Sequence, residues 1–155
     1  MEERRLQARW SSCKDDDEMR NGIHTLRGTL ELPMTEARRT ALFNGSFTSN
    51  FKVIDIQIFP SVIANNDAIV ILHFDDVLKT EASGKDSAQF GWAAIDGLAQ
   101  DWSYVDPDHV IINDLHISGI AAGAGDINYV IKLERITTNL SQSILDEVKN
   151  RQQNV

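Results

Sequence analysis

Histidine and aspartate side chains recur at two-residue spacing in two separate segments. His73 is followed by Asp75, and Asp114 is followed by His116. Residues two apart on a β-strand project from the same face, so each pair could present an imidazole and a carboxylate to a metal ion. Isolated pairs of this kind are common, and only proximity of the two segments would create a metal site. We therefore predict no metal or other cofactor, and keep these four residues as the best candidates for metal ligands.

Other reactive residues lack the pattern that catalysis needs. The single cysteine, Cys13, lies near the N-terminus, and no serine occupies the strand-to-helix turn of a nucleophile elbow. The acidic run at residues 15–18 lacks the glycine and glutamate spacing of a calcium-binding loop. The glycines at residues 119–125 precede a predicted strand, whereas a phosphate-binding glycine loop opens a helix. These observations predict a protein that is not an enzyme.

Three aromatic residues in the second half of the chain are candidates for a binding face. Trp92 is flanked by Phe90 and Ala94 in a strand-like segment, so we expect it in the core. Trp102 and Tyr104 lie in the sequence GLAQDWSYVDPD, which is typical of a long loop. Exposed aromatic rings stack on the apolar faces of sugars and anchor protein interfaces. The chain could therefore bind carbohydrate or a protein partner through Trp102, Tyr104 and adjoining loops.

The charge of the chain disfavours nucleic acid as a partner. Fifteen basic and twenty-three acidic residues give a formal net charge of −8, the wrong sign for a surface that neutralises phosphates. Residues 51–134 hold thirteen acidic residues against four lysines and no arginine, and residues 1–9 hold three arginines against two glutamates. We expect little direct nucleic-acid binding. The charged N-terminus and the lack of a run of roughly 20 apolar residues predict a protein without signal peptide or membrane span.

Apolar residues at an interval of two predict strands along most of the chain. In residues 51–59 this alternation places Ile54, Ile56 and Ile58 on the inner face of a sheet. The predicted strands cover residues 23–32, 51–59, 67–74, 90–95, 109–118 and 127–136.

The segments outside these strands follow other patterns. The stretch from Met34 is typical of a helical turn capped by Thr35. Residues 119–126 read GIAAGAGD, which is typical of an extended hairpin loop, and small glycines also suit close contact with a neighbouring subunit. Residues 1–22 mix both charges with few apolar residues, so we expect a mobile N-terminal arm.

After residue 136 the apolar spacing becomes helical. Leu140, Ile144, Leu145 and Val148 predict a short C-terminal helix at about residues 139–151. Strands without alternating long helices favour two antiparallel layers over a parallel α/β sheet. The predicted fold class is mainly β: one antiparallel, jelly-roll-like β-sandwich domain at residues 23–155, which includes the helix and follows the N-terminal arm.

The C-terminal third resembles a known group of proteins. Its sequence VDPDHVIINDLHISG is followed by INYVIKLERI and by a helical segment ending in VKNRQQ. These segments combine an Asp-Pro turn, two strands and a final helix rich in Asn, Arg and Gln. In these features, over about fifty of the 155 residues, the chain resembles small coat-like virion proteins encoded by uncultured environmental viruses. The resemblance implies a coat-like or virion-associated sandwich.

Together, the patterns and the resemblance predict a structural protein that assembles with copies of itself, in particular a viral coat or other virion component. We expect it in the virion, or in the cytoplasm if it is not a coat. The alternative is a non-catalytic β-sandwich module that binds carbohydrate or a protein partner. Contacts with a neighbouring copy or a ligand are expected at Trp10, Trp102, Tyr104, Gly119, Gly123, Gly125, Leu140, Ile144 and Val148.

Overall fold

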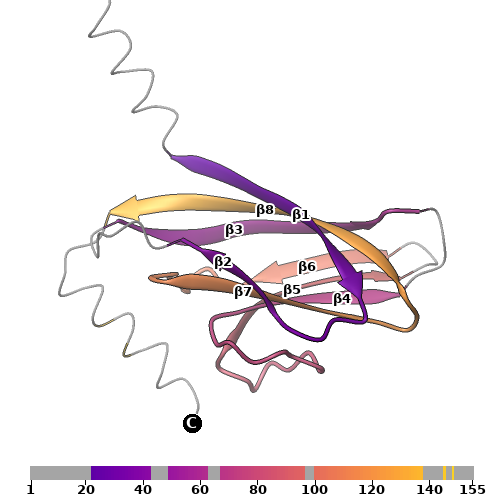
Figure 1. Cartoon of the computed structure of the whole chain (residues 1–155). Coiled ribbons are helices and arrows are strands. Elements are labelled where there is room, and N and C mark those ends of the chain that lie inside the picture. The colour runs from indigo at the N-terminus through magenta and orange to yellow at the C-terminus, as the bar shows by residue number, and fades with distance from the viewer. Residues whose placement is uncertain are drawn as a thin grey trace, which may run out of the picture.

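A computed structural model describes residues 22–42, 49–62, 67–96 and 100–137, together with Leu145 and Val148. In these ranges the chain is mainly β and forms a sandwich of two antiparallel sheets (Figure 1), which confirms the predicted class at this level. Most of the predicted N-terminal arm and C-terminal helix, with Trp10, Leu140 and Ile144, lies outside the described residues. The strands are β1 (Ile23–Leu32), β2 (Arg38–Ala41), β3 (Ser49–Pro60), β4 (Ala68–His73), β5 (Gln89–Asp96), β6 (Gln100–Val105), β7 (Asp114–Ala121) and β8 (Gly125–Thr137).

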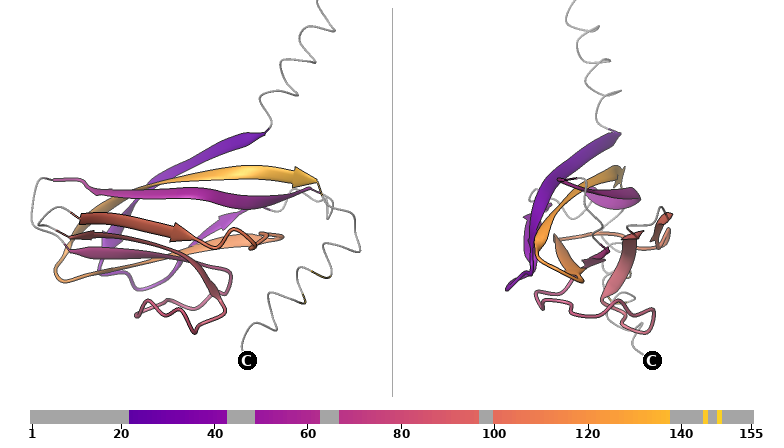
Figure 2. Two further views of the ribbon diagram at one scale, coloured as in Figure 1. Left: turned by 180° about the vertical axis from the view of Figure 1, so that it is seen from behind. Right: turned by 90° about the vertical axis from the view of Figure 1, so that its right-hand side faces the viewer.

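The strands are divided unequally between the two sheets. In the described part of the chain, sheet A has three strands in the order β1-β8-β3, and sheet B has five in the order β2-β7-β4-β5-β6. Neighbouring strands are antiparallel throughout. Figures 1 and 2 show the two layers stacked face to face, and β3 contacts both β5 and β6. β3 and β6 are therefore edge strands on the same side of the sandwich.

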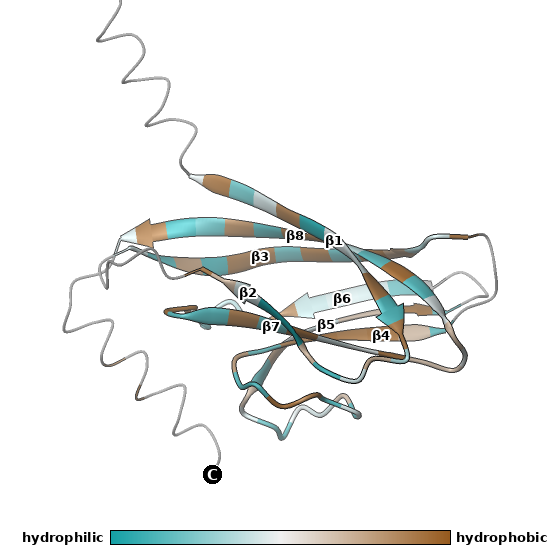
Figure 3. Ribbon diagram, viewed as in Figure 1, coloured by the Kyte–Doolittle hydropathy of each residue, from teal (hydrophilic) through white to brown (hydrophobic). Residues whose placement is uncertain are grey.

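The core lies between the inner faces of the two sheets. Apolar residues alternate with polar ones along the long strands, as the bands of colour on β8 show (Figure 3). Full burial of one aliphatic side chain contributes about 1.5–3 kcal/mol relative to leaving it exposed, so this interface is the main source of stability. Both sheets supply aliphatic side chains that are completely buried: Leu30, Ile56, Val70, Leu72, Leu115, Ile117 and Ile131.

A β-bulge in β3 changes the alternation that the sequence predicts. The prediction that Ile54 shares the inner face with Ile56 and Ile58 is wrong, because Ile54 is 44% exposed. The register between β3 and β8 shifts between Val53 and Asp55. An extra residue in one strand of an antiparallel pair is left unpaired, and its side chain can turn away from the core.

Two segments that the sequence assigns to other structures are strands. Residues 38–41 form β2 rather than a helical turn, and the predicted long loop with Trp102 and Tyr104 contains β6. β2 pairs with β7, and β6 pairs with β5. These ladders depend on partners elsewhere in the chain, and cross-strand packing outweighs the weak local preference of a short segment.

The connection between β7 and β8 is shorter than predicted, because only residues 122–124 separate the two strands. Gly119 lies within β7 and is buried, not in a loop. A Cβ at this position would be 2.8 Å from Leu32 Cδ2 and 3.2 Å from Leu30 Cδ1. The missing side chain therefore allows sheets A and B to approach each other closely at Gly119.

We predict that Gly119→Val lowers the free energy of unfolding by about 1–3 kcal/mol, because the added methyl groups overpack the contact with Leu32 and Leu30. Denaturation in urea, followed by circular dichroism, measures the change. Gly123→Val is the matched control, since nothing lies within 4 Å of a Cβ at Gly123, and it should change stability by less than about 0.5 kcal/mol. Equal effects of the two substitutions would contradict the core position of Gly119.

Candidate functional site

The outer face of sheet B contains most of the residues that the sequence marks as chemically interesting. The segment 74–88, which connects β4 to β5 and is called here the cover segment, folds back over part of this face (Figures 1 and 2). Ile71 and Ser118 are cross-strand neighbours on this face, yet both are 0% exposed. The part of the face that remains open is a row of cross-strand neighbours: Ile120, Ile69, Ala94 and Trp102.

A buried hydrogen-bond network holds the cover segment on sheet B. His73 Nδ1 lies 2.8 Å from the carbonyl oxygen of Asp75 and 3.0 Å from its Oδ1, and His73 Nε2 lies 2.7 Å from Ser118 Oγ. A carbonyl oxygen can only accept a hydrogen bond, so Nδ1 bears the proton and donates to Asp75. Nε2 then accepts from the Ser118 hydroxyl, whose oxygen also accepts from the Lys79 backbone N–H at 3.0 Å.

The sequence of contacts from Ser118 through His73 to Asp75 matches the connectivity of nucleophile, base and orienting carboxylate in serine hydrolases. The side chains of Ser118 and His73 are, however, both completely buried, and a nucleophile must be reached by its substrate. Burial lowers the pKa of His73, although its hydrogen bonds to Asp75 oppose this effect, so the ring is neutral near pH 7. In this arrangement the network positions the cover segment rather than presenting a nucleophile.

The predicted metal candidates come together only in part. His73 and His116 are register partners, and their rings stack with a centroid distance of 5.7 Å. Asp114 instead forms an ion pair with Arg39 at 2.7 Å, and His116 Nε2 lies 3.5 Å from Asp76 Oδ1. Among the described residues, no group of three or more His, Cys, Asp or Glu side chains is arranged to hold a metal ion.

Ion pairs and a glutamine hold other parts of the cover segment. Lys79 Nζ lies 2.7 Å from Asp75 Oδ2 and 3.0 Å from Asp86 Oδ2. Burial lowers the pKa of Lys79, but its hydrogen bonds to these two carboxylates outweigh burial and raise the pKa overall. Buried Gln89, at the start of β5, donates to the Glu81 carbonyl oxygen at 2.9 Å. Gln89 thus binds the cover segment to sheet B, and the ion pairs of Lys79 join separate parts of the cover segment to one another.

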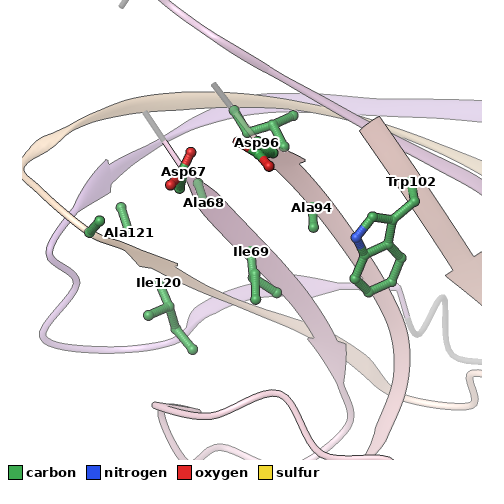
Figure 4. A pocket seen from close by; sticks show the side chains of 10 residues that line it. Asp67, Ala68, Ile69, Ala94, Asp96, Trp102, Ile120 and Ala121 are labelled. Carbon is green, nitrogen blue, oxygen red and sulfur yellow. The ribbon is translucent and has the colours of Figure 1, made fainter. Parts of the chain in front are cut away.

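The open part of the outer face forms a hollow of about 500 Å³ (Figure 4). Ile69 and Ala94 lie on its floor, and the Trp102 indole borders it on one side. Asp67 and Asp96 lie together at one end, as Figure 4 shows. Trp102 is 54% exposed, so its ring is accessible to a ligand in the hollow.

The neighbouring aromatic residues depart from the sequence prediction. Trp92 was expected in the core but is half-buried on the outer face, where its Nε1 donates to Gln89 Oε1 at 2.8 Å. Phe90 takes a core position instead, because the register between β4 and β5 shifts near the start of β5. Tyr104, which is 57% exposed, stacks on Trp92 with a centroid distance of 6.3 Å. Trp102 and Tyr104 therefore lie on the same strand face, but only Trp102 lines the hollow.

The remaining predicted contact residues are spread over the molecule. Gly123 is exposed in the connection between β7 and β8, and Gly125 begins β8 opposite Leu32. Val148 is 44% exposed. The structure does not bring these residues to the floor of the hollow.

Sequence reasoning missed Ser118, Asp67 and Asp96. Ala68 pairs with Ile95, so the same register sets Asp67 opposite Asp96. The signal in the sequence is an aspartate just before one apolar strand and another at the end of a second. That signal becomes informative only once the pairing of the two strands is known.

Comparison of the chain with protein-family models, with curated proteins and with solved structures finds no match. The function is therefore inferred from the residues of this chain alone. Over the ranges that the structure describes, no helix has the length and apolar character needed to cross a bilayer.

We predict that Ser118→Ala lowers the free energy of unfolding by about 1–3 kcal/mol, because it removes the buried partner of His73 Nε2 and of the Lys79 N–H. Equilibrium denaturation measures the loss. Ser103→Ala, at an exposed position of β6, is the matched control and should cost less than about 0.5 kcal/mol. If Ser118→Ala costs no more than this control, the network does not hold the cover segment.

A further buried histidine, His109, packs against Phe74 at the start of the cover segment. The ring of His109 stacks on Phe90 with a centroid distance of 3.9 Å, and Phe74 lies on the same stack at 5.9 Å. Burial lowers the pKa of His109 to about 4, although the charge of Asp106 opposes the shift. The folded chain therefore keeps this ring neutral well below pH 6.5.

Because the pKa of His109 is lower in the folded chain, the unfolded chain binds more protons between pH 6.5 and about 4, and stability falls as the pH falls through this window. The full effect amounts to about 3 kcal/mol. We predict that His109→Phe, which retains an aromatic ring in the stack, flattens the pH dependence. Urea denaturation at about pH 7 and about pH 4.5 measures this difference. Parallel pH profiles of the two proteins would contradict a buried, neutral His109.

Proposed function

We propose that the chain is a structural subunit that assembles with copies of itself, as a viral coat or other virion component built on a jelly-roll sandwich. The pairing order supports the jelly roll, because β1 pairs with β8, β2 with β7, and β4 with β5, as in a nested hairpin. β3 and β6 form the remaining pair in this order, and they are in contact between the two sheets. Eight-stranded jelly rolls occur in capsid and lectin domains. The predicted C-terminal helix at about residues 139–151 remains part of this proposal.

The observation that supports assembly most strongly is the edge of β3, which among the described strands pairs on one side only, with β8. Because β6 pairs with β5 instead of extending sheet A, β3 is left as an edge strand of 12 residues. Among the described residues, the bridge on this edge joins Phe51 and Ile111, at the start of β3. Further along, Ile54 is 44% exposed and Phe59 is 50% exposed. A long edge with exposed apolar side chains is a template for pairing with another chain.

The edges on the other side of the sandwich are protected by arginine. β2 has only four residues, and its Arg38 and Arg39 are exposed. The Arg38 guanidinium also donates a hydrogen bond of 2.7 Å to the carbonyl oxygen of Thr29, on the edge strand β1. Short length and positive charge both oppose edge-to-edge pairing. This contrast favours β3 as the strand that meets a second copy.

A second hollow, of about 490 Å³, lies beside the open edge and is lined by residues of β3, β5 and β6. Ile56 and Phe59 of β3 face it, together with Ala93 and Trp102. A strand from a neighbouring copy that pairs with β3 could place alternate side chains in this hollow, as in β-augmentation. Two copies related by a twofold axis would pair β3 with β3 and satisfy both edges at once.

The net charge of each chain affects how readily two copies associate. Each chain has a formal charge of −8, so the approach of two copies is opposed by long-range repulsion. β3 itself is neutral, since Lys52 and Asp55 are its only charged residues. Salt screens the long-range repulsion while leaving the apolar contact intact. The proposal therefore expects assembly to strengthen with salt, and the assembled protein to hold little nucleic acid by direct charge contact.

We predict that light scattering after size exclusion, with negative-stain images of the same fractions, reveals dimers or larger assemblies that increase with protein and salt concentration. The double variant Ile54→Lys and Phe59→Lys should disperse them, because two lysines on an edge strand oppose pairing. Ile23→Lys is the matched control, since Ile23 is 61% exposed on β1, the other edge of sheet A.

The control variant should assemble as the unchanged protein does. Two results would count against the proposal: a monomer of 17.4 kDa at every protein and salt concentration, or dispersal by Ile23→Lys without dispersal by the double variant. Thermal unfolding of each variant verifies that the exposed substitutions leave the fold intact.

A further inference from the structure

The hollow on the outer face of sheet B is an apolar groove that stays open among the described residues. Ile69, Ala94 and Ile120 place aliphatic side chains on its floor, and Trp102 forms one wall (Figure 4). Ile69 and Ile120 are only half-buried, and Trp102 is 54% exposed. A concave apolar surface of this kind favours a partner that inserts apolar side chains.

The C-terminal segment carries exposed apolar side chains of the matching kind. Leu145 is 61% exposed and Val148 is 44% exposed. In the predicted helix these two residues share one face with Leu140 and Ile144, and amphipathic helices bind by laying such a face in an apolar groove. Residues 138–155 hold two acidic and two basic residues, so the segment itself is neutral in a chain that is strongly negative.

The path of β8 determines whose hollow this segment can enter. Ala121 and Ala122 line the hollow just before β8 begins at Gly125. The 13 residues of β8 then run along the sandwich, so Thr137 lies at the opposite end, about 40 Å away (Figure 1). Val148 follows Thr137 by eleven residues, which rise only about 17 Å in a helix. In its predicted helical form the segment therefore falls short of the hollow in its own chain.

We propose that the hollow binds the predicted C-terminal helix of a neighbouring copy, with Leu145 and Val148 packed against Ile69, Ile120 and Trp102. The contact joins two different surfaces, so it can repeat from copy to copy, whereas a twofold contact between β3 strands closes at two copies. This inference rests on the proposed assembly and deepens it, because it names the second contact by which dimers grow into a larger coat.

A labelled peptide separates this contact from assembly through β3. The probe is a synthetic peptide of residues 138–155 with fluorescein at its N-terminus. It is titrated with the full-length double variant Ile54→Lys and Phe59→Lys, in which lysines oppose pairing at the β3 edge. Fluorescence anisotropy should give a dissociation constant of about 10–300 µM, because the groove is open and the peptide must be ordered on binding.

Substitutions in and beside the hollow locate the peptide. In the same background, Trp102→Ser and Ile120→Ser should each weaken binding at least about tenfold. Ile120 lines the outer hollow but not the hollow beside β3, so its effect is specific to this site. Tyr104→Ser is the matched control, since Tyr104 is as exposed as Trp102 on the same face of β6 but does not line the hollow. Its affinity should stay within about twofold.

Substitutions in the peptide test the face that binds. Leu145→Ser together with Val148→Ser should weaken binding at least about tenfold. Gln142→Ser together with Gln153→Ser, on the polar face of the predicted helix, should leave the affinity within about twofold. In the otherwise unchanged full-length protein, the Leu145 and Val148 pair of substitutions should stop assembly at dimers, as measured by light scattering.

Four results would overturn the inference. The first is no binding of the peptide at about 1 mM protein, above the expected dissociation constant. The second is a loss of affinity with Tyr104→Ser as large as with Trp102→Ser. The third is binding of a peptide of residues 1–21, weakened by Ile120→Ser, in place of residues 138–155. The fourth is assembly beyond dimers that the Leu145 and Val148 substitutions leave unchanged.

The same measurements keep this contact distinct from the one at β3. Peptide binding by a protein that does not pair through β3 would support the helix contact while refuting the β3 contact. Dimers that form through β3 without any peptide binding would do the reverse. Amide NMR spectra verify the fold of each full-length variant.

Discussion

The structure depends on one constraint: three strands of sheet A must cover the apolar inner face of the five-stranded sheet B. β3 packs over both β5 and β6, and the burial of this interface supplies most of the stability. Among the described strands, the unequal division leaves β3 at the edge of sheet A and β6 at the edge of sheet B. Trp102, on β6, consequently borders both the hollow beside β3 and the hollow on the outer face. The exposed edge of β3 and the hollow beside it therefore both arise from this imbalance.

The outer face of sheet B carries apolar side chains, among them Ile69, Ile71 and Ile120, and the cover segment lies over only part of it. The cover segment buries one half, where Ile71 and Ser118 become inaccessible. The His73 ring, through Asp75, and the Ser118 hydroxyl, through the backbone N–H of Lys79, hold the segment there. The other half, around Ile69 and Trp102, is left as the hollow. An apolar concave surface that remains open in a folded chain is the usual form of a ligand site.

The strands that could be predicted from the sequence are those in which apolar and polar residues alternate regularly. Leu30 and Leu32 of β1, and Ile127 and Ile131 of β8, follow a strict period of two and are buried as expected. β2 and β6 were missed because short strands depend on a ladder partner rather than on their own pattern. The bulge at Ile54 was missed because a shift of register between two strands cannot be recognised from the residue types alone. Trp102 was named as a candidate contact residue, and its side chain is 54% exposed; the position of Asp67 opposite Asp96 can be recognised only from the pairing of β4 with β5.

The contact between copies at the open edge of β3 is tested most directly by hydrogen exchange of backbone amides in assembled and dispersed protein. Among residues 53–60, the amides that point away from β8 should exchange at least about tenfold more slowly in the assembled protein. Amides of β1, at the opposite edge of sheet A, should exchange at the same rate in both states. Slower exchange in β1 or in the loops, with no change in residues 53–60, would show that copies meet elsewhere and would contradict the role of β3.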